Sequence, residues 1–124
     1  MLQRSGTSWK PIARISLPKR VKFEDYSALS LRGRRLAVIS QRSSKLWIGA
    51  LQFGKWTIAD EGEIYQFPRA KKGKIIYKTL EGLAWLSDHS FVCVSDRAKK
   101  HHRKACEKKD QSIHVFELPK GRKE

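Results

Sequence analysis

The stretch Leu80–Pro119 decides the fold: it reads LEGLAWLSDHSFVCVSD (80–96), then RAKKHHRKACEKK (97–109), then DQSIHVFELP (110–119). Its apolar runs and turn residues predict a strand, a tight turn, a second strand, a long loop and a third strand. The segment Tyr26–Leu51 has the same layout with a much shorter loop. The sequence therefore predicts a unit of three strands that occurs twice.

An alignment of the chain with itself supports this duplication. It places Tyr26–Gln41 on Glu81–Asp96 without a gap. The next strand, Lys45–Leu51, then matches Ser112–Leu118. The second unit carries extra residues before its third strand, and this insertion contains the basic loop. We call this match of the two units the repeat alignment.

The other apolar patterns also favour strands. Ile12–Leu17 alternates apolar and polar residues before Pro18, which predicts a half-buried strand. The near-continuous runs Leu36–Ile39 and Phe91–Val94 predict strands that are buried on both faces. No apolar residues recur at helical spacing across three turns, so the sequence predicts an all-β chain of antiparallel sheets.

We divide the chain into a loose lead-in (1–10), one all-β domain (11–119) and a basic tail (120–124). The repeat units run from about 23 to 68 and from about 78 to 119. The spacing of the units, from Tyr26 to Glu81, with three or four short strands in each, is typical of β-propeller blades. Because a propeller closes with ~4–8 blades, two blades indicate a fragment, a half that self-associates to cover its open edges, or a small sandwich of blade-like sheets.

The charge balance is the strongest bulk property of the 124-residue chain. Twenty-seven Lys and Arg residues against twelve Asp and Glu residues give a net charge of +15. Such a surface attracts nucleic acid, anionic headgroups, phosphorylated ligands or acidic proteins, or is simply a basic surface without a dedicated partner. There is no apolar run of signal-peptide or membrane-spanning length. With only two cysteines and no disulfide framework, we expect a soluble, cytoplasmic protein.

The second unit resembles part of a phytase-like, esterase-like β-propeller family. The resemblance is carried by Glu81–Trp85, Val94–Asp96 and Ser112–Phe116, and similar patterns occur in propeller-like proteins of photosynthetic organisms. It implies a propeller fold with calcium as a cofactor and metal-bridged phosphate chemistry. The chain is far shorter than a full member of that family, so a site assembled from many blades is not expected here.

Glu81 and Asp96 are the candidate metal ligands. Each lies at a strand end beside an apolar run, where carboxylates in a propeller can bind a hard cation such as calcium. Calcium takes about six to eight oxygen ligands, and two carboxylates supply too few. The alternative interpretation is that both residues cap turns and accept hydrogen bonds from backbone amides.

The insertion Arg97–Lys109 is the candidate anion-binding site. Its cations are Arg97, Lys99, Lys100, Arg103, Lys104, Lys108 and Lys109. Coulomb attraction would let them hold phosphate groups in a salt-sensitive way, whereas a solvated loop is the alternative. The insertion lacks base-stacking aromatics, and the chain contains no recognised nucleic-acid motif, which weakens a nucleic-acid function.

His101, His102 and Cys106 suggest a metal site, but their spacing lacks the paired ligands of structural zinc sites. Cys93 lies in an apolar run and is interpreted as a small core residue, whereas the cations beside Cys106 favour its thiolate. No P-loop, GxSxG, HExxH or GxGxxG pattern occurs, so an enzyme is not favoured. We predict a non-catalytic binding or assembly module for an anionic partner. The alternatives are a calcium-dependent phosphoesterase and weak, non-specific nucleic-acid binding.

Overall fold

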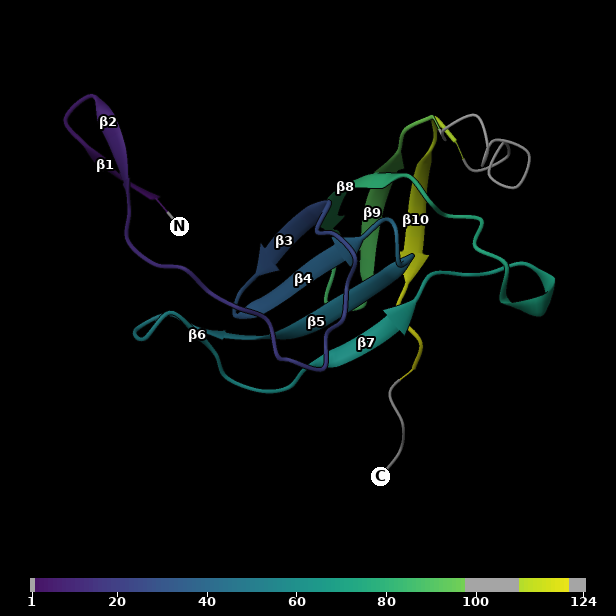
Figure 1. The fold of residues 1–124 in the computed structure, drawn as a ribbon, viewed down its shortest axis with the longest axis horizontal. Coiled ribbons are helices and arrows are strands. Elements are labelled where there is room, and N and C mark those ends of the chain that lie inside the picture. Colours follow the sequence, from purple (N-terminus) through teal and green to yellow (C-terminus); the bar gives the residue numbers. More distant parts are fainter. Residues whose placement is uncertain (1, 98–109, 121–124) are drawn as a thin grey trace.

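The computed structural model describes residues 2–97 and 110–120, in which strands form three antiparallel sheets (Figure 1). The N-terminal hairpin contains β1 (Leu2–Ser5) and β2 (Ser8–Pro11). The first sheet contains β3 (Ala28–Arg32), β4 (Arg35–Ser40), β5 (Lys45–Gln52), β6 (Thr57–Ile58) and β7 (Glu63–Gln66). The second sheet contains β8 (Leu80–Trp85), β9 (Ser90–Ser95) and β10 (Ile113–Glu117). The connection from β7 to β8 contains one 3₁₀ turn, η1 (Lys71–Gly73). The described elements are otherwise strands, so the predicted all-β class is confirmed.

Each of the two large sheets contains three consecutive strands in an antiparallel meander. In the first sheet the order is β3–β4–β5, with β6 and β7 both pairing with the far edge of β5. In the second sheet the order is β8–β9–β10. Gly33 adopts a φ of 60° in the β3–β4 turn, a conformation that glycine reaches without a steric penalty.

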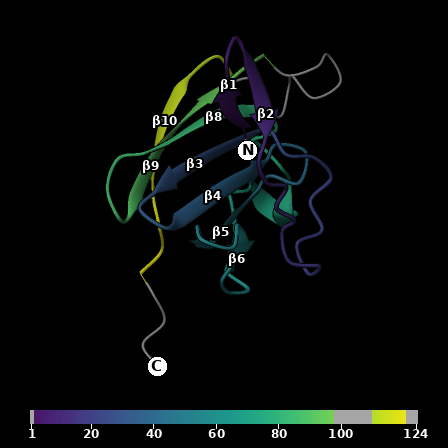
Figure 2. The ribbon, with the colours of Figure 1, turned by 90° about the vertical axis from the view of Figure 1, so that its left-hand side faces the viewer.

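The main core lies between the two large sheets, where β3 and β8 run side by side (Figure 2). Strands β4 and β5 contribute Ala37, Ile39, Leu46 and Ile48, which are between 0% and 6% exposed. The second sheet and the connection before it contribute the buried residues Phe67, Tyr77, Leu80, Phe91 and Cys93. Phe67 packs edge-on against Phe91 and Phe116, so aromatic rings fill much of this layer.

A second, smaller core covers the opposite face of the first sheet. Val38 and Trp47 are buried there against Val21, and Leu17 and Phe23 pack at its margin. Strands β4 and β5 are therefore buried on both faces, as the apolar run Leu36–Ile39 predicts.

The corresponding prediction for Phe91–Val94 is wrong for one of its faces. Phe91 and Cys93 point into the core and are 4% and 1% exposed, but Val94 is 47% exposed. The reason is that no layer of the described chain covers the outer face of the second sheet.

The N-terminal part of the chain also differs from expectation. Ile12–Leu17 is not a strand: Ala13, Ile15 and Leu17 are partly buried in alternation, but the segment pairs with no neighbouring strand. Its alternating pattern reflects packing against the first sheet without a ladder of hydrogen bonds. The sequence predicted no strand before residue 11, yet β1 and β2 form a hairpin that stands apart from both sheets (Figure 1).

Candidate functional site

Cations from three connections gather at one end of the sheets, where β4, β7 and β9 end and β5, β8 and β10 begin. The connections at this end are the turn 41–44, the segment 67–79 and the loop that leaves after Arg97 and returns at Asp110. We call this region the basic end. The described cations of these connections are Arg42, Arg69, Lys71, Lys72, Lys74, Lys78 and Arg97.

Hydrogen bonds hold the first two connections together. Arg69 Nη2 donates to the Ser43 carbonyl at 2.9 Å, and Lys78 Nζ donates to the Arg42 carbonyl at 3.3 Å. The buried Ser44 hydroxyl donates to the Tyr77 carbonyl at 2.7 Å. The turn 41–44 is therefore held against both ends of the segment 67–79.

The third connection is tied to the segment 67–79 through Thr79. Its hydroxyl lies 2.7 Å from the Asp96 carbonyl and 3.4 Å from Asp110 Oδ1. The Asp96 N–H in turn donates to the Thr79 carbonyl at 3.0 Å. The predicted basic insertion therefore starts and ends beside the basic connection that precedes β8.

Glu24, Asp96 and Asp110 lie at the same end as these cations. The ion pairs of the described chain, Arg20–Glu61 and Arg32–Asp88, involve none of them. Asp25 lies at this end, but its Oδ1 accepts hydrogen bonds from the Ser40 hydroxyl and the Arg42 N–H. Arg69 Nε is buried without a hydrogen-bond partner among the described residues. No ion pair of the described chain therefore joins a cation of the basic end to a carboxylate.

Of the predicted anion-binding residues, Arg97 is described and is exposed at the basic end. Its backbone N–H donates to Asp96 Oδ1 at 2.7 Å. The other cations predicted for this site, Lys99, Lys100, Arg103, Lys104, Lys108 and Lys109, lie outside the described residues.

The two candidate metal ligands are both exposed. Asp96 Oδ1 accepts a hydrogen bond from the Arg97 backbone N–H just after β9. This contact matches the alternative interpretation, in which the carboxylate caps a turn. Glu81 lies in β8 at a shift in the register between Leu80 and Gly82. Among the residues that the structure describes, no three His, Cys, Asp or Glu side chains form a cluster suited to a metal ion. A role for Glu81 and Asp96 in calcium binding stays a prediction.

Of the two cysteines, Cys93 lies within the described residues. Cys93 is a free thiol that is 1% exposed, and burial raises its pKa to about 12. A thiol with this pKa is protonated at neutral pH and is a poor nucleophile. Cys106 lies outside the described residues together with His101 and His102, so the proposed HHxxxC metal site is not described.

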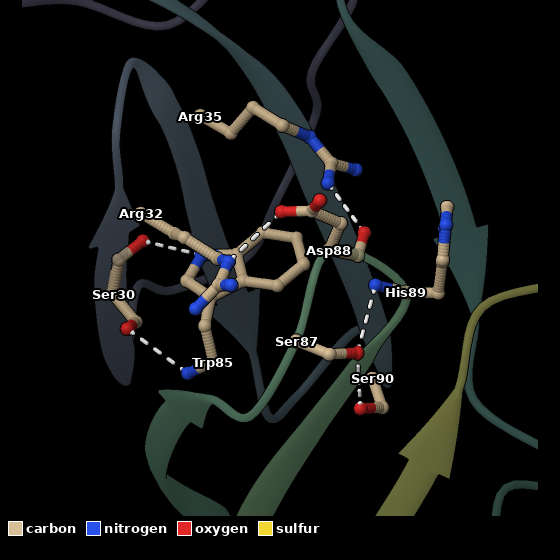
Figure 3. A network of polar contacts seen from close by, with 8 residues as sticks. All are labelled: Ser30, Arg32, Arg35, Trp85, Ser87, Asp88, His89 and Ser90. Atoms are coloured by element: carbon tan, nitrogen blue, oxygen red, sulfur yellow. Dashed lines mark hydrogen bonds and ion pairs between the residues drawn. The ribbon is translucent and has the colours of Figure 1, made fainter.

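A polar network joins the β3–β4 and β8–β9 turns at the other end of the sheets (Figure 3). Arg32 Nε lies 2.9 Å from Asp88 Oδ1, and this hydrogen bond and charge hold the pKa of Asp88 below its ordinary value. Arg35 donates to the Asp88 carbonyl at 2.5 Å and lies over the Trp85 ring, 4.6 Å from its centroid. Arg32 and Arg35, from the first sheet, both bind Asp88 in the second sheet, so we interpret the network as a structural contact between the two turns and call it the turn clamp.

Trp85 completes the clamp by bonding across to β3. Its backbone N–H donates to Ser30 Oγ at 3.3 Å, and its indole Nε1 donates to the Ser30 carbonyl at 3.2 Å. These two bonds give partners to polar groups of Trp85 and Ser30 where β8, an edge strand of the second sheet, lies beside β3, an edge strand of the first.

Sequence reasoning missed the cations that do not belong to the insertion: Arg42, Arg69, Lys71, Lys72, Lys74 and Lys78. In an antiparallel meander alternate connections lie at the same end of one sheet. This rule does not orient one sheet relative to another, so it could not place Arg42, in the first sheet, beside the ends of the insertion, in the second. The contacts of the segment 67–79 depend on side-chain hydrogen bonds that a sequence pattern does not show.

Comparisons of this chain with protein-family models, with curated proteins and with solved structures found no match. In the described part of the chain, no helix has the length and hydrophobicity needed to span a membrane.

Proposed function

We propose that this chain is a non-catalytic binding module that holds an anionic partner at its basic end. The observation that carries the proposal is the convergence of cations from three separate connections on one end of the sheets, without ion pairs to the described carboxylates. A cluster of unneutralised cations raises the local concentration of a polyanion and accelerates its association. The net charge of +15 acts in the same direction over longer distances.

The anionic partner we favour is one with several charges at close spacing, such as an acidic protein segment or a nucleic-acid backbone. Lys71, Lys72 and Lys74 are exposed on one short loop and present a dense group of charges. The aromatic rings of the same segment, Phe67 and Tyr77, are buried, so affinity would come from charge and not from base stacking. Weak, sequence-independent binding to nucleic acid is the second form of the same activity.

We also propose that the two large sheets are copies of one propeller-type unit. The repeat alignment superimposes the bounds of β4 on those of β9. It also matches the pairing of Ile39 with Leu46 to the pairing of Val94 with Ile113. The β8–β9 pairing departs by one residue from that of β3–β4, because the two turns differ in length. The resemblance to phytase-like propellers stays a prediction.

A binding titration across ionic strength tests the function. The variant Lys71→Glu/Lys72→Glu/Lys74→Glu reverses three charges at the basic end. The matched control Lys10→Glu/Lys19→Glu/Lys55→Glu makes the same change in net charge with exposed lysines elsewhere. Fluorescence anisotropy would follow binding to labelled polyglutamate and to a labelled single-stranded oligonucleotide at 50–300 mM salt.

The basic-end variant should bind each probe at least about tenfold more weakly than the control variant at low salt. Its salt dependence with the oligonucleotide should also fall by about 0.7 in slope for each phosphate that the variant no longer neutralises. Equal losses in the two variants would show that net charge alone drives binding, and the proposed site would be wrong. No binding of the unmodified chain at 50 mM salt would reject the proposal altogether.

A further inference from the structure

The outer face of the second sheet is apolar and open to solvent. Val94, Ile113 and Val115 on β9 and β10 are 47%, 76% and 68% exposed. Val94 pairs with Ile113 and Val92 pairs with Val115, so these four side chains form one contiguous patch on the same face. An antiparallel sheet whose outer face meets water normally carries polar residues there. We call this patch the outer valine face.

The first sheet shows how such a face is used within this chain. In the repeat alignment, the outer valine face corresponds to Ala37, Ile39, Leu46 and Ile48. Those residues are at most 6% exposed, because the inner face of the second sheet packs on them. The outer valine face therefore has the composition of a surface that another sheet covers.

A complementary surface lies at the opposite side of the two-sheet stack. An apolar groove of about 510 Å³ runs beside the N-terminal segment over β3 and β4. Its lining includes Ile15, Leu17, Leu29, Leu31, Leu36 and Val38. Leu29 and Leu31 are 66% and 43% exposed, so the groove is open to a partner.

The groove corresponds to the inner face of the second sheet. Leu36 and Val38 match Phe91 and Cys93 in the repeat alignment. Phe91 and Cys93 are covered jointly by the first sheet and by the buried residues that precede β8. Among the described residues, Leu36 and Val38 pack with the N-terminal segment 17–23 and with residues of their own sheet, which leaves the groove in the place where a preceding sheet would lie.

We propose that the outer valine face of one copy of this chain docks in the apolar groove of a second copy, head to tail. One chain carries both halves of the contact, and each half matches a surface that is already paired between its own two sheets. This inference rests on the duplication proposed above but not on anion binding. A head-to-tail contact closes into a ring when its rotation allows, and otherwise extends as an open filament; the blade-like stacking of the two sheets favours the ring. With two blade-type sheets per chain and ~4–8 blades in a closed propeller, a ring would contain about two to four copies.

The solution mass and a mixing experiment test this contact. Val115→Glu places a charge on the outer valine face, and Leu29→Glu places one in the groove. Light scattering after size exclusion, at 0.15 M and 0.5 M salt, should give two to four times 14.4 kDa for the unmodified chain and 14.4 kDa for each variant alone. An equimolar mixture of the two variants should form a 1:1 dimer, because the mixture retains one intact face and one intact groove.

The control is Trp9→Glu, which changes a residue 65% exposed on the N-terminal hairpin and should keep the unmodified mass. Ile113→Lys provides a second outer-face variant, and thermal unfolding checks that each variant folds. A monomeric unmodified chain at millimolar concentration would overturn the proposal. So would a mixture that stays monomeric, or a Leu29→Glu chain that dimerises by itself through two outer valine faces.

Failure here is separable from failure of the proposed function. Val115→Glu leaves the cations of the basic end in place, so its anisotropy titration with polyglutamate reports anion binding in the monomer. Higher salt weakens anion binding but not apolar contacts. An assembly that dissociates at 0.5 M salt would therefore contradict the apolar contact proposed here.

Discussion

At the scale of single residues, Trp47 sets the tightest constraint on the first sheet. Its side chain is fully buried, and its indole Nε1 donates to the Glu61 carbonyl at 3.0 Å. The ring lies against the backbone of Gly49, where a Cβ atom would overlap the ring carbons. Glycine at residue 49 therefore leaves the space that the Trp47 indole occupies.

We expect Gly49→Ala to destabilise the chain by about 1–3 kcal/mol, because the added methyl group overpacks a buried site. Gly54→Ala is the matched control: it lies in the β5–β6 turn, and no atom lies within 4 Å of the position that its Cβ atom would take. The control should be neutral or stabilising by about 0.4–1 kcal/mol, through the entropy of the unfolded chain. Urea unfolding measures both changes. Equal effects in the two variants would contradict this account of the Trp47 site.

At the scale of elements, the turn clamp couples two strand pairs that are far apart in the sequence. Arg32 and Arg35 come from the β3–β4 hairpin, and Asp88 comes from the β8–β9 turn. The clamp closes the end of the sheets opposite the basic end. Arg32 and Arg35 therefore bind Asp88 within the chain at this end of the sheets.

We predict that Asp88→Asn lowers the melting temperature slightly at pH 7, because the variant loses the ion pair with Arg32. The Asp88 pKa is lowered in the folded chain from 3.8, so this stabilisation is present above 3.8 and is lost as the pH falls through the folded-state pKa. The difference between the variant and the unmodified chain should therefore shrink below pH 3.8. Thermal melts between pH 2.5 and 7 would measure it, with the exposed Glu117→Gln as control. A difference that persists unchanged at the lowest pH would contradict the ion-pair explanation.

At the scale of the whole molecule, two sheets present three distinct surfaces: the basic end, the outer valine face and the apolar groove. The two apolar surfaces lie on opposite sides of the stack, and the cations lie at the ends of the strands. Assembly through the apolar surfaces would therefore leave the basic ends exposed. A ring of copies would present several basic ends to one polyanion, which raises avidity without a new contact.

The alternative function, a calcium-dependent phosphoesterase, can be tested on the whole molecule against the binding module proposed above. We expect 1 mM calcium to leave the melting temperature unchanged and to support no turnover of a phosphate ester. The reason is that Glu81 and Asp96 are exposed and belong to no cluster of three metal-ligating side chains in the described part of the chain. Differential scanning fluorimetry and a phosphate-release assay would measure this. A calcium-dependent rise in melting temperature that Glu81→Gln abolishes and Glu63→Gln does not would favour the enzyme.

The sequence by itself determined the positions of the main strands of the two large sheets. The apolar runs and the turn residues locate β3, β4, β5, β8, β9 and β10, because alternation and turn chemistry act over a few neighbouring residues. Ile12–Leu17 marks the limit of this reasoning: its alternation is real, but a strand also requires a neighbour with free backbone groups.

Only the tertiary structure decided which faces are buried and which charges gather. The runs Leu36–Ile39 and Phe91–Val94 look alike in sequence, yet Ile39 is buried and Val94 is exposed. The difference arises because burial depends on whether another layer, supplied from a distant part of the chain, lies over that face. In the same way, Arg42, Lys78 and Arg97 share one surface because separate connections return to one end of the sheets. That proximity is a property of strand order in space, which no local pattern of residues contains.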